Sequence, residues 1–252
     1  MNKTVSLVIT SCDRFDLLEE TLKSFFYFNT YSLEQIIIIE DSGNEKDLKK
    51  VLDKFSTQKF TILVNKEKLG QLKSIDKAYS FVNSEYVFHC EDDWKFTKFG
   101  FIEKSIEILE RNTKILSVWI RNINEFPTIS FSDDLFLIEP KKEDSEKYKL
   151  VYDEILSFNP SLKRMKEYND ICTYSQFEST SFETEISNFY KEREFVSAIL
   201  LNSCVEHLGW HRRVANINKN KSSFGYWFDS KFKKIKASFY KKLSIGKFKD
   251  NK

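Results

Sequence analysis

Residues 86–94 read YVFHCEDDW, and this stretch decides how the rest of the chain is interpreted. The apolar run Tyr86–Phe88 leads into three consecutive acids at positions 91–93. Adjacent carboxylates repel one another, so such a cluster gains little on an ordinary surface. A divalent cation changes that balance, because hard oxygen ligands suit Mg²⁺ and Mn²⁺. The pattern indicates either a metal-assisted phosphate site or a solvated acidic turn that caps a helix beginning near Thr97.

Length and composition are those of a soluble globular protein. The 252 residues can bury the core of one large α/β domain or two small ones. The formal net charge of +2 gives no overall field that favours a polyanionic partner such as nucleic acid. Only 6 glycines and 3 prolines are present, which excludes flexible linkers and collagen-like tracts.

The cysteines and the amino-terminal segment point to a cytoplasmic protein. The 4 cysteines (Cys12, Cys90, Cys172 and Cys204) are far apart and include no CxxC pair, which argues against a zinc ribbon and a disulfide scaffold. We expect them to be reduced and mostly buried. The first ten residues contain too short an apolar run for a signal peptide, and no stretch approaches the ~20 apolar residues of a membrane span.

Apolar runs alternate with segments of helical period over the first hundred residues. Strands are predicted at 5–10, 35–40 and 60–64, and a fourth in YVFHCEDDW. Asp16 is predicted to cap the first helix, with Glu19 completing a capping box. Strand–helix alternation of this kind predicts a parallel, doubly wound sheet.

Each of these strands ends in a polar or acidic cluster, namely SCDR, EDSGN, NKEKLG and EDDW. Ligands bind at the carboxyl ends of the strands in such sheets, so four clusters that converge there predict a nucleotide-type site. The first turn has no GxGxxG, and the chain has no GxxxxGK[ST]. A dinucleotide-binding Rossmann unit and a P-loop are therefore excluded.

The segments VSLVITSCDR, IIIIEDSGN, NKEKLGQLKSIDKAY and SEYVFHCEDDW, in this order, resemble the nucleotide-sugar-binding half of a GT-A glycosyltransferase close to family 2. The resemblance implies an α/β GT-A fold, with a Rossmann-like, mostly parallel central sheet flanked by helices. Residues 1–100 would form the nucleotide-sugar-binding half of the domain and residues 101–220 the acceptor-binding half. EDDW stands where that superfamily carries its DxD motif.

The resemblance also implies roles for individual residues of the first half. Asp93 would bind Mg²⁺ or Mn²⁺, whose Lewis acidity helps a diphosphate depart. Glu91 and Asp92 would face the ribose and the donor sugar. The remaining implied contacts to the donor are Asp41 with Glu40 at the base and ribose, the turn Thr10 to Arg14 (Asp13 included) around the nucleoside, and Lys73 near the phosphates. Solvated charges are the alternative for Arg14 and Lys73.

Two acids in the second half are candidates for the catalytic base. An inverting transferase needs a carboxylate within hydrogen-bond reach of the acceptor hydroxyl. The family places this acid just before a helix, often as an ED pair, whereas this chain has Glu183-Thr184-Glu185. We favour Glu183 over Glu185. The alternative for either acid is a helix amino-terminal residue favoured by the macrodipole.

A late polar segment supplies the other candidates. GT-A enzymes often recruit a late histidine as a further metal ligand, and His207 is the best match. Arg212 or Arg213 would hold the diphosphate, since a guanidinium binds phosphate oxygens in bidentate fashion. The alternative for His207 is an ordinary core or surface histidine.

The rest of the second half gives weaker patterns. We predict strands at 115–120, 131–138 and 195–204, a solvated excursion at 141–149 and a polar turn at 157–162. In the tail, residues 221–252, lysines alternate with Phe232, Ile235 and Phe239 as in a basic amphipathic helix. Such a helix lies on an anionic membrane, here the inner face, or packs on its own domain.

The resemblance, taken together with these patterns, implies an inverting, metal-dependent hexosyltransferase of cell-surface polysaccharide synthesis. It would move a sugar from a nucleoside-diphosphate sugar to a hydroxyl of a glycan or lipid-linked glycan. One alternative is a non-catalytic nucleotide-sugar-binding or membrane-associated scaffold module. A sugar nucleotidyltransferase is the other, although those enzymes open with a glycine-rich loop that SCDR does not match.

Overall fold

The computed structural model describes residues 3–125, 131–132, 147–177, 179–209 and 212. The strands are β1 (Val5–Ser11), β2 (Gln35–Glu40), β3 (Thr61–Val64), β4 (Tyr86–Glu91), β5 (Trp94–Phe96), β6 (Ile115–Trp119), β7 (Phe131–Ser132), β8 (Tyr148–Val151), β9 (Ser161–Arg164), β10 (Val196–Leu200) and β11 (Val205–His207). The helices are α1 (Phe15–Phe28), α2 (Glu45–Leu52), α3 (Gln71–Tyr79), α4 (Phe101–Arg111), α5 (Met165–Ile171) and α6 (Phe182–Lys191). Short 3₁₀ turns lie at Asp53–Phe55, Ile123–Glu125 and Ser175–Phe177.

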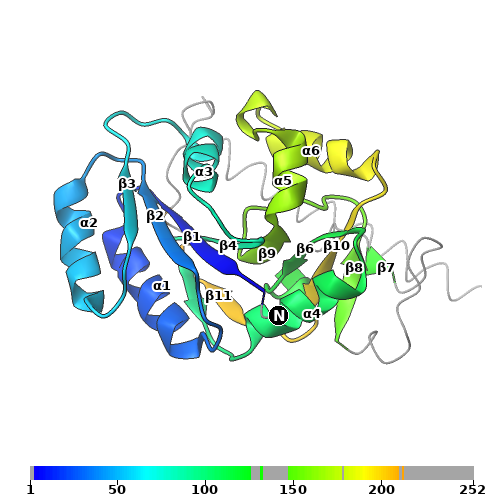
Figure 1. Ribbon diagram of the computed structural model, residues 1–252, viewed down its shortest axis with the longest axis horizontal. Coiled ribbons are helices and arrows are strands. Elements are labelled where there is room, and N and C mark those ends of the chain that lie inside the picture. Colours follow the sequence, from blue (N-terminus) through cyan, green and yellow to red (C-terminus); the bar gives the residue numbers. More distant parts are fainter. Residues whose placement is uncertain (1–2, 126–130, 133–146, 178, 210–211, 213–252) are drawn as a thin grey trace, which may run out of the picture.

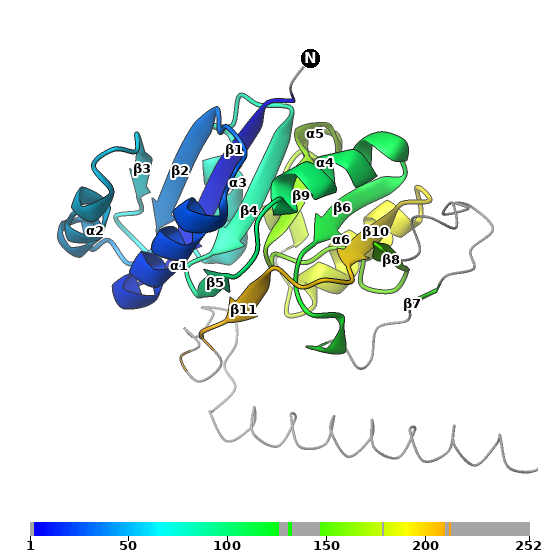
Figure 2. The same ribbon diagram turned by 90° about the horizontal axis from the view of Figure 1, so that it is seen from below.

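A nine-stranded sheet in the order β3-β2-β1-β4-β9-β6-β10-β8-β7 runs through the molecule (Figure 1). Strands β3, β2, β1 and β4 are parallel to one another, as the alternation of strands and helices predicts. Strand β9 lies antiparallel between β4 and β6. A separate antiparallel pair, β5 with β11, lies beyond the carboxyl end of β4 (Figure 2).

Helices cover both faces of the sheet, which gives the flanked α/β architecture that the sequence predicts. Helices α1, α2 and α4 lie on one face and α3, α5 and α6 on the other (Figures 1 and 2). Each face has its own cluster of buried apolar side chains. β-Branched and aromatic residues on the buried strands fill both clusters, because a central strand is covered on each side.

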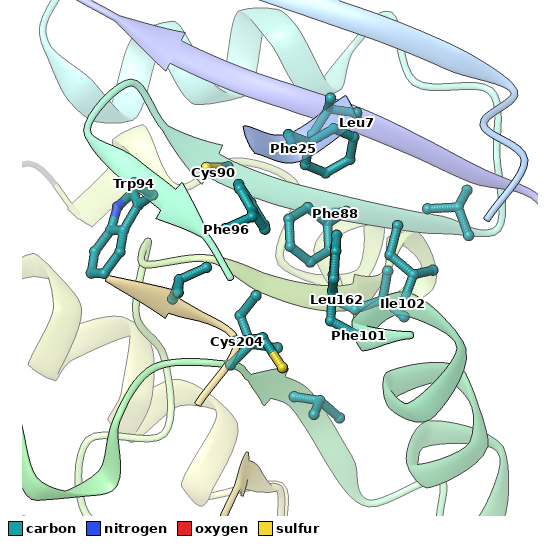
Figure 3. Packing of buried hydrophobic residues seen from close by; sticks show 14 of the residues in the cluster. Leu7, Phe25, Phe88, Cys90, Trp94, Phe96, Phe101, Ile102, Leu162 and Cys204 are labelled. Atoms are coloured by element: carbon teal, nitrogen blue, oxygen red, sulfur yellow. The ribbon is translucent and has the colours of Figure 1, made fainter. Parts of the chain in front are cut away.

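An aromatic cluster on the first face fixes the position of the acidic turn after β4. The Phe25 ring of α1 lies 5.0 Å from Phe96 of β5 and 5.8 Å from both Phe88 of β4 and Phe101 of α4 (Figure 3). Ring pairs at these separations stabilise beyond their area of burial. The strands before and after the turn are thus both packed against α1.

Several local predictions from the sequence are wrong. Helix α1 begins at Phe15, and no side chain caps it, so Asp16 lies in its first turn instead of at a cap. Part of the predicted turn at 157–162 is strand, because Ser161 and Leu162 belong to β9. Strand β8 occupies the end of the predicted solvated excursion.

Other predictions are confirmed in part or lie outside the described residues. The late strand ends at Leu200, four residues before the predicted boundary at Cys204. All four cysteines are free, but Cys172 is exposed. Residues 133–138 of a predicted strand, the charge run up to 146 and the tail from 221 lie outside the described residues. Within the described part of the chain, no helix is long and apolar enough to cross a membrane.

Candidate active site

The acidic turn between β4 and β5 is buried and tied to α1. Thr21 of α1 donates its hydroxyl proton to the Asp92 carbonyl oxygen at 2.8 Å. The same hydroxyl oxygen accepts a hydrogen bond from the Trp94 amide at 3.0 Å. Asp92 and Asp93 are both buried. A solvated acidic turn is therefore the wrong interpretation of EDDW.

Arg14 brings positive charge to this turn from the end of β1. Its guanidinium donates to Asp93 Oδ2 at 2.6 Å and also to Asp92 Oδ1. The Cys12 amide donates to the second oxygen of Asp92 at 3.2 Å. Arg14 is thus an ion-pair partner of both aspartates and not a solvated charge.

His207 reaches the same carboxylate from the late strand β11. Pairing of β11 with β5 sets His207 opposite Trp94, and His207 Nε2 lies 3.2 Å from Asp93 Oδ2. The amide of Leu208 donates to the Asp93 carbonyl oxygen at 2.8 Å. The structure therefore brings together the acid and the histidine that the resemblance selected as metal ligands, although 114 residues separate them along the sequence (207 − 93).

Gly209 lets the chain pass directly over Asp93. A Cβ atom at this position would lie 2.1 Å from Asp93 Oδ2 and 2.8 Å from Asp93 Cγ. Gly209→Ala is therefore expected to push the Asp93 carboxylate out of position. We predict that the variant folds but loses metal-dependent nucleotide binding by about tenfold or more, since ligand geometry controls affinity. Calorimetric titration with Mn²⁺ and a nucleoside diphosphate measures this, and unchanged affinity would contradict it.

Burial and mutual repulsion disfavour the simultaneous ionisation of all three acids of the turn. Burial raises the pKa of Asp92 to about 7. Burial and the two neighbouring aspartates raise the pKa of Glu91 to about 8. Burial opposes ionisation of Asp93 as well, but the hydrogen bond from His207 and the Arg14 charge hold its pKa below the usual value. Asp93 is thus kept as a carboxylate, the form that binds a cation.

The residues at Asp93 would fit a divalent cation if a bound phosphate supplied its other ligands. Asp93 Oδ1 is buried and has no hydrogen-bond partner among the described residues. Asp93 and His207 supply one carboxylate and one imidazole. No group of three or more potential metal ligands occurs in the described part of the chain. Mg²⁺-type ions are commonly held by one or two protein groups plus substrate phosphates, so two ligands suffice here.

The end of β2 forms the other side of the site. Glu40 Oε1 accepts hydrogen bonds from the Asp13 and Ser42 amides, at 3.1 and 2.9 Å. Both oxygens of Asp41 accept bonds from the chain itself, from the side chain of Asn65 and the amides of Leu69 and Gly70. These two acids tie the loops that follow β1 and β3 to the end of β2.

Three predicted donor contacts differ in their surroundings. Thr10 lies in β1 opposite Glu91 of β4. Lys73 is exposed on α3. Arg212 pairs with Asp16, and its carbonyl oxygen accepts a bond from Arg14 at 3.4 Å. Arg213 lies outside the described residues.

The two candidate bases occupy the first turn of α6, where their side chains have different surroundings. Glu185 Oε1 accepts bonds from the Ser179 and Ser181 hydroxyls, at 2.5 and 3.1 Å. Glu183 Oε1 lies 3.5 Å from the Phe158 amide, and Glu183 acts electrostatically on Glu91 at the end of β4. Glu185 is therefore held by two serine hydroxyls, whereas Glu183 is the acid whose charge acts on the end of β4.

Sequence reasoning missed Thr21, Gly209 and Lys163. Thr21 falls on the apolar face of the first predicted helix, where a threonine is unremarkable. Gly209 follows His207 by two residues, and a glycine beside a candidate ligand was the available signal. Lys163 gives no sequence signal, because lysines are almost always exposed.

Comparison with known proteins supports the resemblance. A model of the family described as "Glycosyl transferase family 2" matches residues 6–177. A comparison with curated proteins found no match. One similar solved structure is mannosyltransferase PcManGT from Pyrobaculum calidifontis in complex with GDP-Man and Mn²⁺, with a TM-score of 0.61, 11% identity, and coverage of 84% of this chain and 59% of that one.

A second similar structure is GalNAc-T7 with UDP, GalNAc and Mn²⁺. Its TM-score is 0.64 at 13% identity, and the match covers 87% of this chain and 46% of that one. The chain thus spans 59% and 46% of the lengths of these two proteins, and the likeness shows the GT-A fold. Because the family model matches well over half of the 252 residues, the chain belongs to glycosyl transferase family 2.

Proposed function

We propose that this chain transfers a hexose from a nucleoside-diphosphate sugar to a hydroxyl of a glycan or lipid-linked glycan, with inversion and with Mn²⁺ or Mg²⁺. The observation that carries the proposal is the geometry at Asp93. Its carboxylate meets Arg14, His207 and the Gly209 backbone, and one buried oxygen has no partner among the described residues. The neighbouring structures, solved with a nucleotide or nucleotide sugar and Mn²⁺, support it.

The donor would lie across the carboxyl ends of β1, β2 and β4. The nucleoside would occupy the pocket shaped by Glu40 and Asp41, and the diphosphate would lie near Asp93 and His207. A bound divalent cation would supply Lewis acidity to the diphosphate leaving group. Arg14 would stay beside the aspartates and help to keep Asp93 ionised.

Glu183 would act as the general base. It would accept the proton of the acceptor hydroxyl while that oxygen forms a bond to the anomeric carbon. The bond from the anomeric carbon to the diphosphate breaks with its electron pair on the leaving oxygen. Attack from the face opposite the leaving group inverts the anomeric centre.

The direct test is release of nucleoside diphosphate from a panel of sugar nucleotides, with Mn²⁺ and with EDTA. We expect one nucleotide class to be turned over with Mn²⁺ and not with EDTA. Donor binding without turnover, with any hydroxyl acceptor offered, would favour a non-catalytic binding module. Formation of a sugar nucleotide from a sugar phosphate and a nucleoside triphosphate would favour a nucleotidyltransferase.

A further inference from the structure

A buried lysine lies on the sheet between the candidate donor and acceptor sides. Lys163 of β9 is only 3% exposed and pairs with Val87 of β4 and Ser117 of β6. A lysine is almost never buried in this way unless other groups compensate its charge. The mechanism described above gives it no role.

The Lys163 side chain contacts the segment that meets Glu183. Its Nζ donates to the Ser157 carbonyl oxygen at 3.3 Å and lies 5.2 Å from the centre of the Phe158 ring. The Phe158 amide points to Glu183 Oε1 at 3.5 Å. The Phe158 ring also packs on Phe182, with 6.0 Å between ring centres. Lys163 thus holds the Ser157 carbonyl and the Phe158 ring. Phe158 in turn contacts both Phe182 and Glu183 at the start of α6.

Two acids on different elements interact electrostatically with this ammonium group. Glu91 of β4 and Glu183 of α6 both stabilise the charged form of Lys163, whereas burial lowers the pKa of Lys163 to about 7. His89 of β4 is fully buried, and burial and the Lys163 charge hold its pKa well below the usual value, so it adds no positive charge. Lys163 is therefore a buried cation on this face of the sheet, and Glu183 of α6 is an acid that stabilises its charged form.

We propose that Lys163 is a positioning residue for the base, and that its side chain holds residues 157–158 against Glu183 and supplies a buried positive charge to Glu183. The inference rests on the proposed role of Glu183. A buried positive charge on β9 is a feature that the resemblance does not imply. Without that charge, the Glu183 carboxylate would lose a nearby compensating cation, and the neutral form of Glu183 would be favoured.

The first test compares the pH profiles of full-length Lys163→Met and Lys163→Arg with the natural chain. Removing the positive charge raises the pKa of Glu183, so the acid limb of the kcat profile moves to higher pH. We expect kcat near neutral pH to fall by about tenfold or more, since misplacing a catalytic group by about 1 Å can cost roughly a hundredfold, while the donor KM stays unchanged. Lys163→Arg, which keeps the charge, should restore the acid limb toward its original position.

The matched control is Lys166→Met, three residues on, where the lysine is exposed. It should leave the profile unchanged. A loss in Lys163→Met with an unmoved acid limb and no rescue by arginine would indicate a packing role and overturn the inference. Methionine has the length of the lysine stem, and buried charges replaced by apolar groups of similar volume are often tolerated. Lys163→Gln is measured in parallel, because it removes the charge but keeps a donor for Ser157.

The second test needs no turnover. Chain labelled with ¹³C-glutamate is titrated by NMR, and the Glu183 carboxyl signal is identified by its loss in Glu183→Gln. The midpoint for Glu183 should lie at higher pH in Lys163→Met and Lys163→Gln than in the natural chain. An unmoved midpoint would overturn the inference. A moved midpoint in a chain that turns over no donor would overturn the proposed function and leave the coupling of Lys163 to Glu183 standing.

Discussion

Asp93→Asn is expected to lower kcat with Mn²⁺ by roughly a hundredfold or more, because a metal ion contributes several kcal/mol to transition-state stabilisation in such sites. An amide oxygen is a neutral ligand and holds the cation less strongly than the carboxylate that His207 and Arg14 keep ionised. The remaining activity should respond weakly to EDTA. The measurement is donor turnover across a range of Mn²⁺ concentrations.

The control for this variant is Asp170→Asn, at an exposed position on α5. It should leave the Mn²⁺ dependence unchanged. Circular dichroism of both variants establishes that they fold. Full activity and an unchanged response to EDTA in Asp93→Asn would contradict the assignment of Asp93 as a metal ligand.

Glu183→Gln is expected to lower kcat by about 10²–10⁴, the usual contribution of a positioned general base. Its glutamine keeps the shape of the side chain but cannot accept the acceptor's proton. Donor affinity should be retained, because Glu183 is neither a proposed metal ligand nor a proposed contact of the nucleoside. Binding of the nucleotide and the rate of transfer, measured on the same preparation, separate these effects.

Glu185→Gln is the matched control for Glu183→Gln. Its side chain accepts bonds from the Ser179 and Ser181 hydroxyls, so the change should affect the stability of the first turn of α6 more than the rate. A larger loss of kcat in Glu185→Gln than in Glu183→Gln would reverse the assignment of the base.

The first half of the fold could be predicted from sequence because each of its signals is local. Buried parallel strands such as Gln35–Glu40 are continuous apolar runs, and the helices between them have an unbroken apolar face. The second half could not be predicted in the same way. Strand β9 has only four residues, and the buried Lys163 within it interrupts the apolar pattern.

The prediction for Asp16 was wrong for a related reason. The capping-box pattern considers only neighbours along the chain, but the Asp16 carboxylate pairs with Arg212 from the far end of the described residues. Contacts between residues so far apart leave no periodic trace in the sequence.

The candidate site, like the fold, could be predicted only in part from the sequence. The acids at strand ends could be predicted, because the carboxyl ends of parallel strands converge. The pairing of His207 with Asp93 came from the resemblance alone. The close approach of Gly209 and the hydroxyl bridge of Thr21 depend on how β11 and α1 pack against the turn. Those contacts are known only once the elements are placed in space.

The measurement that tests the central claim most directly is a thermal-unfolding screen of the full chain. It uses nucleoside diphosphates and their sugars, each with Mn²⁺ and with EDTA. A ligand present at about 100 times its dissociation constant adds roughly 2.7 kcal/mol to the free energy of unfolding. We predict a rise in Tm with one nucleotide class in Mn²⁺, lost in EDTA and in Asp93→Asn. No rise with any nucleotide, or the same rise in EDTA, would contradict a metal-dependent nucleotide-sugar site at Asp93.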